Sequence, residues 1–332
     1  MKTRALFLLF VSTIFMMSCE RNTETEGPKL SDIYGDFNVL EDFAASTSKV
    51  DFSKGENVVF TARFNRPTEW EIRISHPSGS EKVLSGRSRE IDATTGVWDG
   101  TTTVFPSFSN GQCTAELFIA ADSSRSSLNV EITGTRQPDG TVVADFDNGV
   151  DPEWNMFVQS GANMSFVTRD TGIIPQGSAY FDMGGEVNWD WLIGLIDFEA
   201  DSYGPDGFGL GQNPENLYFN LVVNRPVDYN NGIILFQFKE DENGDGTFTE
   251  ASEDLYAVEI RDLDPGWRVW SIKYSDLVNL VNGTPAEPNG NKQHNPDKIH
   301  TISCLFLANP SSGYSQVFVD YVAFTIGEPL KL

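Results

Sequence analysis

The sequence has few of the residues that most catalytic and cofactor-binding motifs require. Its 332 residues include three histidines and three cysteines. His76, His294 and His300 stand in no HExxH or other metal-ligand spacing, and the chain has no GxSxG or P-loop motif. We therefore predict no catalytic residues. Glycoside hydrolysis needs only two carboxylates and stays open as an alternative among the 48 acidic side chains.

Disulfides and basic charge are also scarce. Three cysteines form no disulfide framework, so we expect Cys113 and Cys304 to be buried free thiols in strands. Only 23 basic residues oppose the 48 acidic ones, which gives a net charge of −25. Nucleic acid and anionic membrane surfaces repel such a chain, so nucleic acid is excluded as a partner. The acidic residues supply many ligands suited to calcium.

The chain begins with an apolar run that is too short to span a membrane. Lys2 and Arg4 precede mostly apolar residues 5–17, whereas a transmembrane helix needs about 20. The run ends in Met-Met-Ser-Cys, which resembles the lipobox of bacterial lipoproteins. The resemblance implies a signal peptide over residues 1–19 and lipidation of Cys19. The alternative is an ordinary signal peptide with a chance cysteine.

Residues 20–29, ERNTETEGPK, contain no large apolar side chain and are predicted to be an acidic tether. An acidic run directly after a lipidated cysteine resembles the surface-export signal of Gram-negative glycan-utilisation lipoproteins. That resemblance implies a lipid anchor in the outer membrane, a cell-surface location and an outer-membrane transporter as partner.

The sequence has almost no helical periodicity, which predicts an all-β protein. In residues 30–135, segments 57–64 and 69–75 alternate as two strands, and short strands and turns follow. This pattern resembles small immunoglobulin-like sandwiches of secreted enzymes and adhesins, with Trp70 and Trp98 expected in the core. Residues 136–140, RQPDG, are predicted to be a linker.

Residues 141–332 are predicted to form a second, larger β-sandwich. Strands are expected at 142–146, 163–168, 177–183, 190–198, 217–223, 233–239, 255–260, 267–273, 299–307 and 316–326. One or two helical turns are expected at 275–280, with Ser275 as the cap. The Asp-Phe at 145–146, Gly-Ser-Ala-Tyr at 177–180, WRVWSIKYS with Asp-Leu at 267–277, and VFVDYVAF at 317–324 resemble the galactose-binding-like jelly rolls used as carbohydrate-binding modules.

That resemblance implies a polysaccharide or oligosaccharide ligand. Sugar rings stack their C–H faces on aromatic side chains, and their hydroxyls pair with carboxylates and amides. Aromatic residues in or beside loops, with one polar partner, are the candidate ligand-binding residues: Trp154, Trp189, Asp190, Tyr203 and Phe208. The alternative for each aromatic ring is core packing.

A first calcium candidate lies in residues 241–253, DENGDGTFTEASE. Asp241, Asn243 and Asp245 have the 1, 3, 5 spacing of EF-hand and dockerin loops, which they resemble. Position 12 is Ser252, and Glu253 comes one place late. The sequence leaves open whether this segment is a calcium-clamped hairpin or a polar turn.

A second calcium candidate follows from the jelly-roll resemblance, because those modules often hold a structural calcium between the first and last strands. The matching positions are Asp145 or Asp147 with Asp320. A salt-bridging role is the alternative.

Taken together, the sequence predicts a non-catalytic, surface-anchored glycan-binding lipoprotein. The alternatives are a lipid-anchored glycoside hydrolase or polysaccharide lyase, and a structural adhesin.

Overall fold

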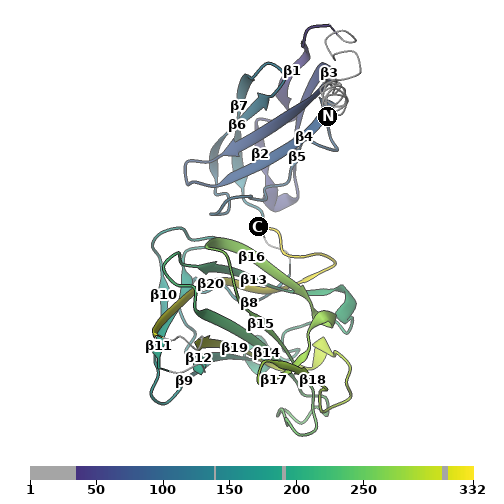
Figure 1. The fold of residues 1–332 in the computed structure, drawn as a ribbon. Coiled ribbons are helices and arrows are strands. Elements are labelled where there is room, and N and C mark those ends of the chain that lie inside the picture. Colours follow the sequence, from purple (N-terminus) through teal and green to yellow (C-terminus); the bar gives the residue numbers. More distant parts are fainter. Residues whose placement is uncertain (1–34, 138–139, 189–191, 309–312) are drawn as a thin grey trace, which may run out of the picture.

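The computed structural model describes residues 35–137, 140–188, 192–308 and 313–332. Strands form nearly all of its regular structure (Figure 1). The helices in these ranges are five 3₁₀ turns: Phe52–Lys54, Ala200–Tyr203, Pro214–Asn216, Tyr274–Asp276 and Pro296–Lys298. The all-β prediction is therefore confirmed. Across the described residues, no helix combines the length and apolar character needed to cross a lipid bilayer.

The first part of the chain forms one hydrogen-bonded sheet of seven strands. They are β1 (Val39–Ala45), β2 (Lys49–Asp51), β3 (Val58–Ser75), β4 (Glu81–Ile91), β5 (Val97–Trp98), β6 (Gly111–Ile119) and β7 (Ser124–Gly134). The order is β1-β3-β6-β7-β2, with β4 and β5 also paired to β3. The strands enclose a core in which Trp70 and Trp98 are buried, as predicted, and Cys113 is a buried free thiol.

The expected strands at 57–64 and 69–75 are one continuous strand, β3. Pro67 lies between them and would be expected to end a strand, because it has no N–H to donate. The pairing of β3 with β4 shifts register between Arg63 and Thr68, so Pro67 falls where the ladder is interrupted. Alternate residues on both sides of the interruption enter the same core, including Phe60 and Ile72.

The second part contains two larger sheets. The six-stranded sheet comprises β8 (Thr141–Ala144), β10 (Asn163–Arg169), β11 (Tyr180–Val187), β13 (Leu217–Arg225), β16 (Gly266–Lys273) and β20 (Gly313–Ile326). The five-stranded sheet has the order β15-β14-β19-β12-β9, with β9 (Asn155–Val158), β12 (Leu192–Glu199), β14 (Gly232–Glu240), β15 (Leu255–Ile260) and β19 (Ile299–Ala308). A small hairpin joins β17 (Asn279–Val281) to β18 (Thr284–Ala286).

These two sheets pack face to face as a sandwich. The ring of Phe219 on β13 lies 4.7 Å from that of Phe236 and 4.9 Å from that of Phe238, both on β14 of the facing sheet. All three rings are fully buried. Cys304 is a buried free thiol in the same core, as the sequence predicts. Alternation along each strand supplies this core, because every second side chain points to one face.

The expected helical segment at 275–280 is mostly extended. A 3₁₀ turn, Tyr274–Asp276, has Lys273 rather than Ser275 at its N-cap, and Leu277 is already in the extended region. Val278 then makes a bridge to Ala257, and β17 begins one residue later. Pairing with neighbouring strands overrides the local helical preference here.

The outer face of the six-stranded sheet is covered. Tyr321 and Ala323 of β20 pack in an apolar cluster with Leu330 and Leu332 of the C-terminal segment, and Phe105 from the first part packs against it. Figure 1 shows the C-terminal end between the two parts of the molecule. The outer face of the five-stranded sheet lies on the opposite side of the sandwich, away from this contact.

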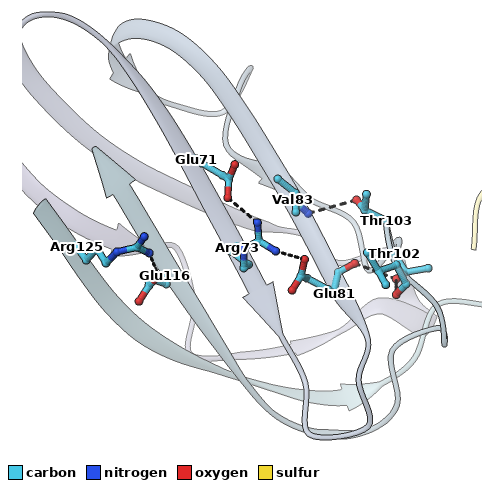
Figure 2. A network of polar contacts seen from close by, with 9 residues as sticks. Glu71, Arg73, Glu81, Val83, Thr102, Thr103, Glu116 and Arg125 are labelled. Atoms are coloured by element: carbon cyan, nitrogen blue, oxygen red, sulfur yellow. Dashed lines mark hydrogen bonds and ion pairs between the residues drawn. The ribbon is translucent and has the colours of Figure 1, made fainter. Parts of the chain in front are cut away.

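The segment that meets the C-terminal residues is braced against β4. Thr102 donates its hydroxyl hydrogen to the Glu81 carbonyl at 3.0 Å, and its N–H donates to the Leu332 carbonyl at 2.6 Å. Figure 2 shows Thr102 and Glu81 beside the Arg73 guanidinium, which pairs with Glu71 and Glu81. Exposed ion pairs contribute about 0–1 kcal/mol each to stability. The hydrogen bonds of Thr102 to the Glu81 and Leu332 carbonyls are therefore the contacts that connect this segment to β4 and to the C-terminal end.

Candidate functional site

The outer face of the five-stranded sheet is the open surface of the sandwich. Strand β14 alternates strictly: Phe236 and Phe238 enter the core, whereas Leu235, Gln237 and Lys239 point outward. The same alternation on β12 and β19 sends polar and aliphatic side chains to this face. The register aligns these side chains in rows across the strands.

One row is polar and crosses four strands. Gln237, Ser303, Asp197 and Asn155 are successive register partners on β14, β19, β12 and β9. Ser303 donates its hydroxyl hydrogen to Asp197 Oδ1, and Asn155 Nδ2 donates to Asp197 Oδ2 at 3.1 Å. The Asp197 carboxylate is thereby held from both sides. The Gln237 amide makes no hydrogen bond to any described residue and is free to meet a ligand.

The next row along the strands carries charge. Lys239, Thr301 and Glu199 are register partners, and Thr301 donates its hydroxyl hydrogen to Glu199 Oε2 at 2.7 Å. His300 Nδ1 lies 2.8 Å from Thr301 Oγ1 and 3.5 Å from Glu199 Oε2. Lys239 Nζ lies 3.9 Å from Asp197 Oδ1, so the two polar rows are connected.

An aliphatic hollow adjoins the polar row on its other side. It has a volume of about 470 Å³, and its apolar lining includes Leu235, Leu305 and Leu307. Leu280 and Gly283 of the β17–β18 hairpin form one wall, beside the paired side chains of Glu259 and Arg261. A hollow with an apolar lining beside fixed hydrogen-bonding groups suits a ligand that has both C–H faces and hydroxyls.

Three aromatic residues expected at the ligand site pack against the core. Phe208 is 4% exposed, so the expectation that its ring faces a ligand is wrong. Tyr203 lies 4.6 Å from the Phe208 ring and donates its hydroxyl hydrogen to the Val143 carbonyl at 2.5 Å. Burial of this hydroxyl raises the pKa of Tyr203. These contacts anchor the loop to the core, with Phe208 buried and Tyr203 partly buried.

Trp154 is held in the same way, by an aromatic sandwich. Its ring stands edge-on to Phe146 at 5.7 Å and to Phe198 at 5.0 Å. It is half-buried against the core rather than part of an open platform. The other two expected residues, Trp189 and Asp190, lie outside the described residues, as does Cys19.

Sequence reasoning missed the polar row, although one signal was present. Asp197 stands in the strand LIGLIDFE, whose only other charged residue is Glu199, and a carboxylate on a core strand must face outward or be paired. Gln237 gives the same signal within IILFQFK. Their alignment with Ser303 depends on strand order, which local sequence does not specify.

The first calcium candidate is a loop closed by its own backbone. Asp241 accepts N–H bonds from Gly244 and Gly246, each at 2.7 Å, and Asn243 Oδ1 accepts the Asp245 N–H at 2.9 Å. Burial acts to raise the pKa of Asp241, but these hydrogen bonds leave it below its ordinary value. Glu253 accepts the Thr249 N–H at 2.6 Å. Calcium binding at Asp241, Asn243 and Asp245 stays a prediction.

The second calcium candidate contains buried oxygens without partners. Asp320 on β20 accepts the Gln176 N–H at 3.0 Å through Oδ2, whereas Asp320 Oδ1 and Gln176 Oε1 have no hydrogen-bond partner among the described residues. Burial raises the pKa of Asp320 to about 8, and the nearby Asp147 and Asp145 carboxylates add to the shift. These oxygens fit a cation with oxygen ligands.

The backbone approaches Asp147 closely at this second candidate. Asp147 Oδ1 accepts the N–H groups of Ser178 at 2.5 Å and Ala179 at 3.2 Å. Gly177 has a φ of +64°, and a Cβ at this position would collide with the Asp147 carboxylate. A glycine is therefore required for the loop to fold over Asp147.

No protein-family model and no curated protein sequence matches the chain. Among solved structures, it is similar to the family 11 carbohydrate-binding module of the cellulosomal cellulase Lic26A-Cel5E of Clostridium thermocellum, with 18% identity over 58% of this chain and 96% of that one (TM-score 0.38). It is also similar to SGBP-B from a complex xyloglucan utilization locus in Bacteroides uniformis, with 14% identity over 87% and 73% (TM-score 0.37). The surface glycan-binding protein PbSGBP-B from Prevotella bryantii matches with 11% identity over 82% and 74% (TM-score 0.37).

Proposed function

We propose that this chain is a non-catalytic glycan-binding protein that captures a polysaccharide on the outer face of its five-stranded sheet. The observation that carries the proposal is the contrast between the two outer faces of the sandwich. The C-terminal segment and Phe105 cover the six-stranded face, whereas the five-stranded face is open and carries a polar row beside an aliphatic hollow.

The polar row supplies what sugar hydroxyls need. The Asp197 carboxylate accepts hydrogen bonds, and the Gln237 amide both donates and accepts. Ser303 and Asn155 fix the carboxylate before a ligand arrives, which reduces the entropy lost on binding. Leu235 and Leu305 offer aliphatic surface to C–H groups. A few such contacts give an affinity on the order of micromolar.

The placement outside the cell is part of the same proposal. Cys19 would carry the lipid that anchors the chain in the outer membrane, and residues 20–29 would hold the binding face away from the surface. An outer-membrane transporter would receive the captured glycan.

Calcium at Asp147, Gln176 and Asp320 would neutralise buried carboxylates and tie the 176–179 segment to β20.

The test is isothermal titration of the chain, without residues 1–19, against a panel of soluble polysaccharides. Gln237→Ala should weaken binding about tenfold at an unchanged melting temperature, because the free amide supports no protein contact. Gln112→Ala, which removes an exposed glutamine on β6, is the matched control and should bind normally. Equal binding by both variants would place the ligand elsewhere.

The same samples test the enzymatic alternative. Asp197 and Glu199 project from one face of β12, so the face holds two carboxylates. We expect no reducing sugar or unsaturated product after prolonged incubation with a bound glycan. If either product is released, and if Asp197→Asn abolishes its release, the function would be hydrolysis or lyase activity instead of binding.

A further inference from the structure

Three carboxylates that belong to none of the sites above converge where β14 ends and β15 begins. Glu240 is the last residue of β14, Glu242 follows in the loop, and Asp254 directly precedes β15. One carboxylate oxygen from each lies within 4.8 Å of the other two. Glu240 and Asp254 are fully buried, and Glu242 is half-buried.

This cluster lacks a balancing cation. No ion pair joins any of the three carboxylates to a lysine or arginine in the described part of the chain. The nearest lysine in the facing loop, Lys292, directs its ammonium to Glu287 at 3.3 Å and offers only its backbone N–H to Asp254. Three carboxylates at such distances repel one another strongly unless protons or a cation intervene.

One oxygen of the cluster is buried and unpaired. Glu240 Oε1 accepts the Tyr274 hydroxyl and the Asn295 N–H, each at 2.8 Å, whereas Glu240 Oε2 has no partner among the described residues. A buried carboxylate oxygen without a partner destabilises the fold, because it has lost its hydrogen bonds to water. One oxygen of this fully buried side chain is therefore left without a partner among the described residues.

The facing loop presents its backbone to the same cluster. Gly290 and Lys292 donate their N–H groups to Asp254, at 2.5 and 2.6 Å. Asn291 donates its N–H to Glu242 at 3.1 Å. Loop residues 287–298 are thus organised around carboxylates that come from another part of the chain. Anything that binds the carboxylates fixes both segments at once.

We infer that Glu240, Glu242 and Asp254 bind one calcium ion. Calcium takes oxygen ligands about 2.3–2.6 Å away, so ligands on opposite sides of it are about 4.6–5.2 Å apart and adjacent ones closer. The observed spread of up to 4.8 Å fits this geometry. Magnesium requires about 2.0–2.1 Å and retains most of its waters, so a cage of three protein carboxylates favours calcium.

This ion is separate from both calcium candidates described above. Glu240 and Glu242 contribute carboxylate oxygens to the cluster, whereas Asp241, which lies between them in the chain, does not. Asp241 accepts only backbone N–H bonds from its own loop. The Asp320 candidate lies on β20 of the other sheet. The three sets of ligands share no residue.

The proposal is tested by counting ions. The chain is dialysed to equilibrium against calcium, and bound calcium is measured by atomic absorption. Glu242→Gln removes one ligand at a half-buried position and should lower the bound calcium by one ion per chain. Glu287→Gln, in the same loop but 83% exposed at its side chain, is the matched control and should bind as the wild type does.

Further variants distinguish the sites and the metal. Asp320→Asn and Asp241→Asn are each combined with Glu242→Gln. If the sites are separate, the calcium lost by each double variant should equal the sum of the losses of its two single variants. Full retention of calcium by Glu242→Gln, or no calcium bound by the wild type, would overturn the proposal. Displacement of the Glu242-dependent ion by an equal concentration of magnesium would overturn the assignment to calcium.

A second measurement reports on structure rather than stoichiometry. Calcium should slow proteolysis within residues 287–298 in the wild type and in Glu287→Gln by several-fold, because the ion closes that loop onto β14. The same addition should leave cleavage of Glu242→Gln unchanged. Equal protection of Glu242→Gln would show that calcium acts through another site, and the proposal would fail.

Discussion

The Ser303 hydroxyl donates a hydrogen bond to the Asp197 carboxylate across the β12–β19 pair. Ser303 is 1% exposed and Asp197 8% exposed, yet both lie on the outer side of the sheet, opposite the aromatic core. The bond therefore satisfies a nearly buried carboxylate, and in the proposed binding site it would also fix the orientation of that carboxylate.

Removal of this hydroxyl should destabilise the protein. Ser303→Ala leaves Asp197 Oδ1 without its donor in a nearly buried position, so we expect a loss of about 1–3 kcal/mol in the free energy of unfolding. Urea denaturation measures it. Ser126→Ala, at an exposed position of β7, is the control and should change stability by less than about 0.5 kcal/mol. Equal losses in the two variants would contradict the assignment.

The aromatic centre of the sandwich should dominate the stability of the second part. Phe238 is fully buried and contacts the Phe219, Tyr274 and Phe324 rings. Phe238→Ala should cost about 3–5 kcal/mol, the range for a buried phenylalanine. Phe157, 45% exposed on edge strand β9, provides the comparison. Phe157→Ala should leave the thermal midpoint nearly unchanged, and a large drop would contradict the described packing of β9.

The two core thiols should be unreactive in the folded protein. Burial raises the pKa of Cys113 to about 12 and that of Cys304 further still. Because the thiolate is the reactive form, reaction with a disulfide reagent should stay slow from pH 7 to pH 9. Denaturant should make both thiols reactive. Rapid native reaction that follows an ordinary thiol pKa would contradict the described burial.

Calcium removal should lower thermal stability. A ligand that binds only the folded state stabilises it by mass action, so a chelator should lower the melting temperature and added calcium restore it. Asp320→Asn should remove part of this response, because Asp320 Oδ1 is an unpaired buried oxygen. No response to chelator or to calcium in the wild type would exclude every calcium site considered above.

Lipidation of Cys19 is tested by fractionation. Cys19→Ala should release the protein from the membrane fraction, because the anchor is the buried acyl chain rather than a protein segment. Ser18→Ala retains the cysteine and should remain with the membranes. Sedimentation of Cys19→Ala with membranes would contradict the lipoprotein prediction.

The all-β class was determined by the local sequence. Mostly apolar runs without helical periodicity identify β15 (Leu255–Ile260) at its exact bounds and β14 and β19 to within one residue at each end. A strand buries every second side chain, and this requirement is visible in a short window. The burial of four further residues was also predicted from the local sequence, because each was expected in a strand or in a sandwich core: Trp70, Trp98, Cys113 and Cys304.

The location of the candidate site was decided by tertiary structure. Gln237, Ser303 and Asp197 are far apart in the chain and become neighbours only through the strand order β14-β19-β12. Tyr203 and Phe208 were expected in a ligand site because they lie in a loop, but that loop folds onto the core, where Phe208 is buried and Tyr203 is partly buried. Alternation specifies which face a side chain takes within its strand. Only the packing of sheets and loops decides which face stays open and which carboxylates, such as Glu240 and Asp254, are brought together.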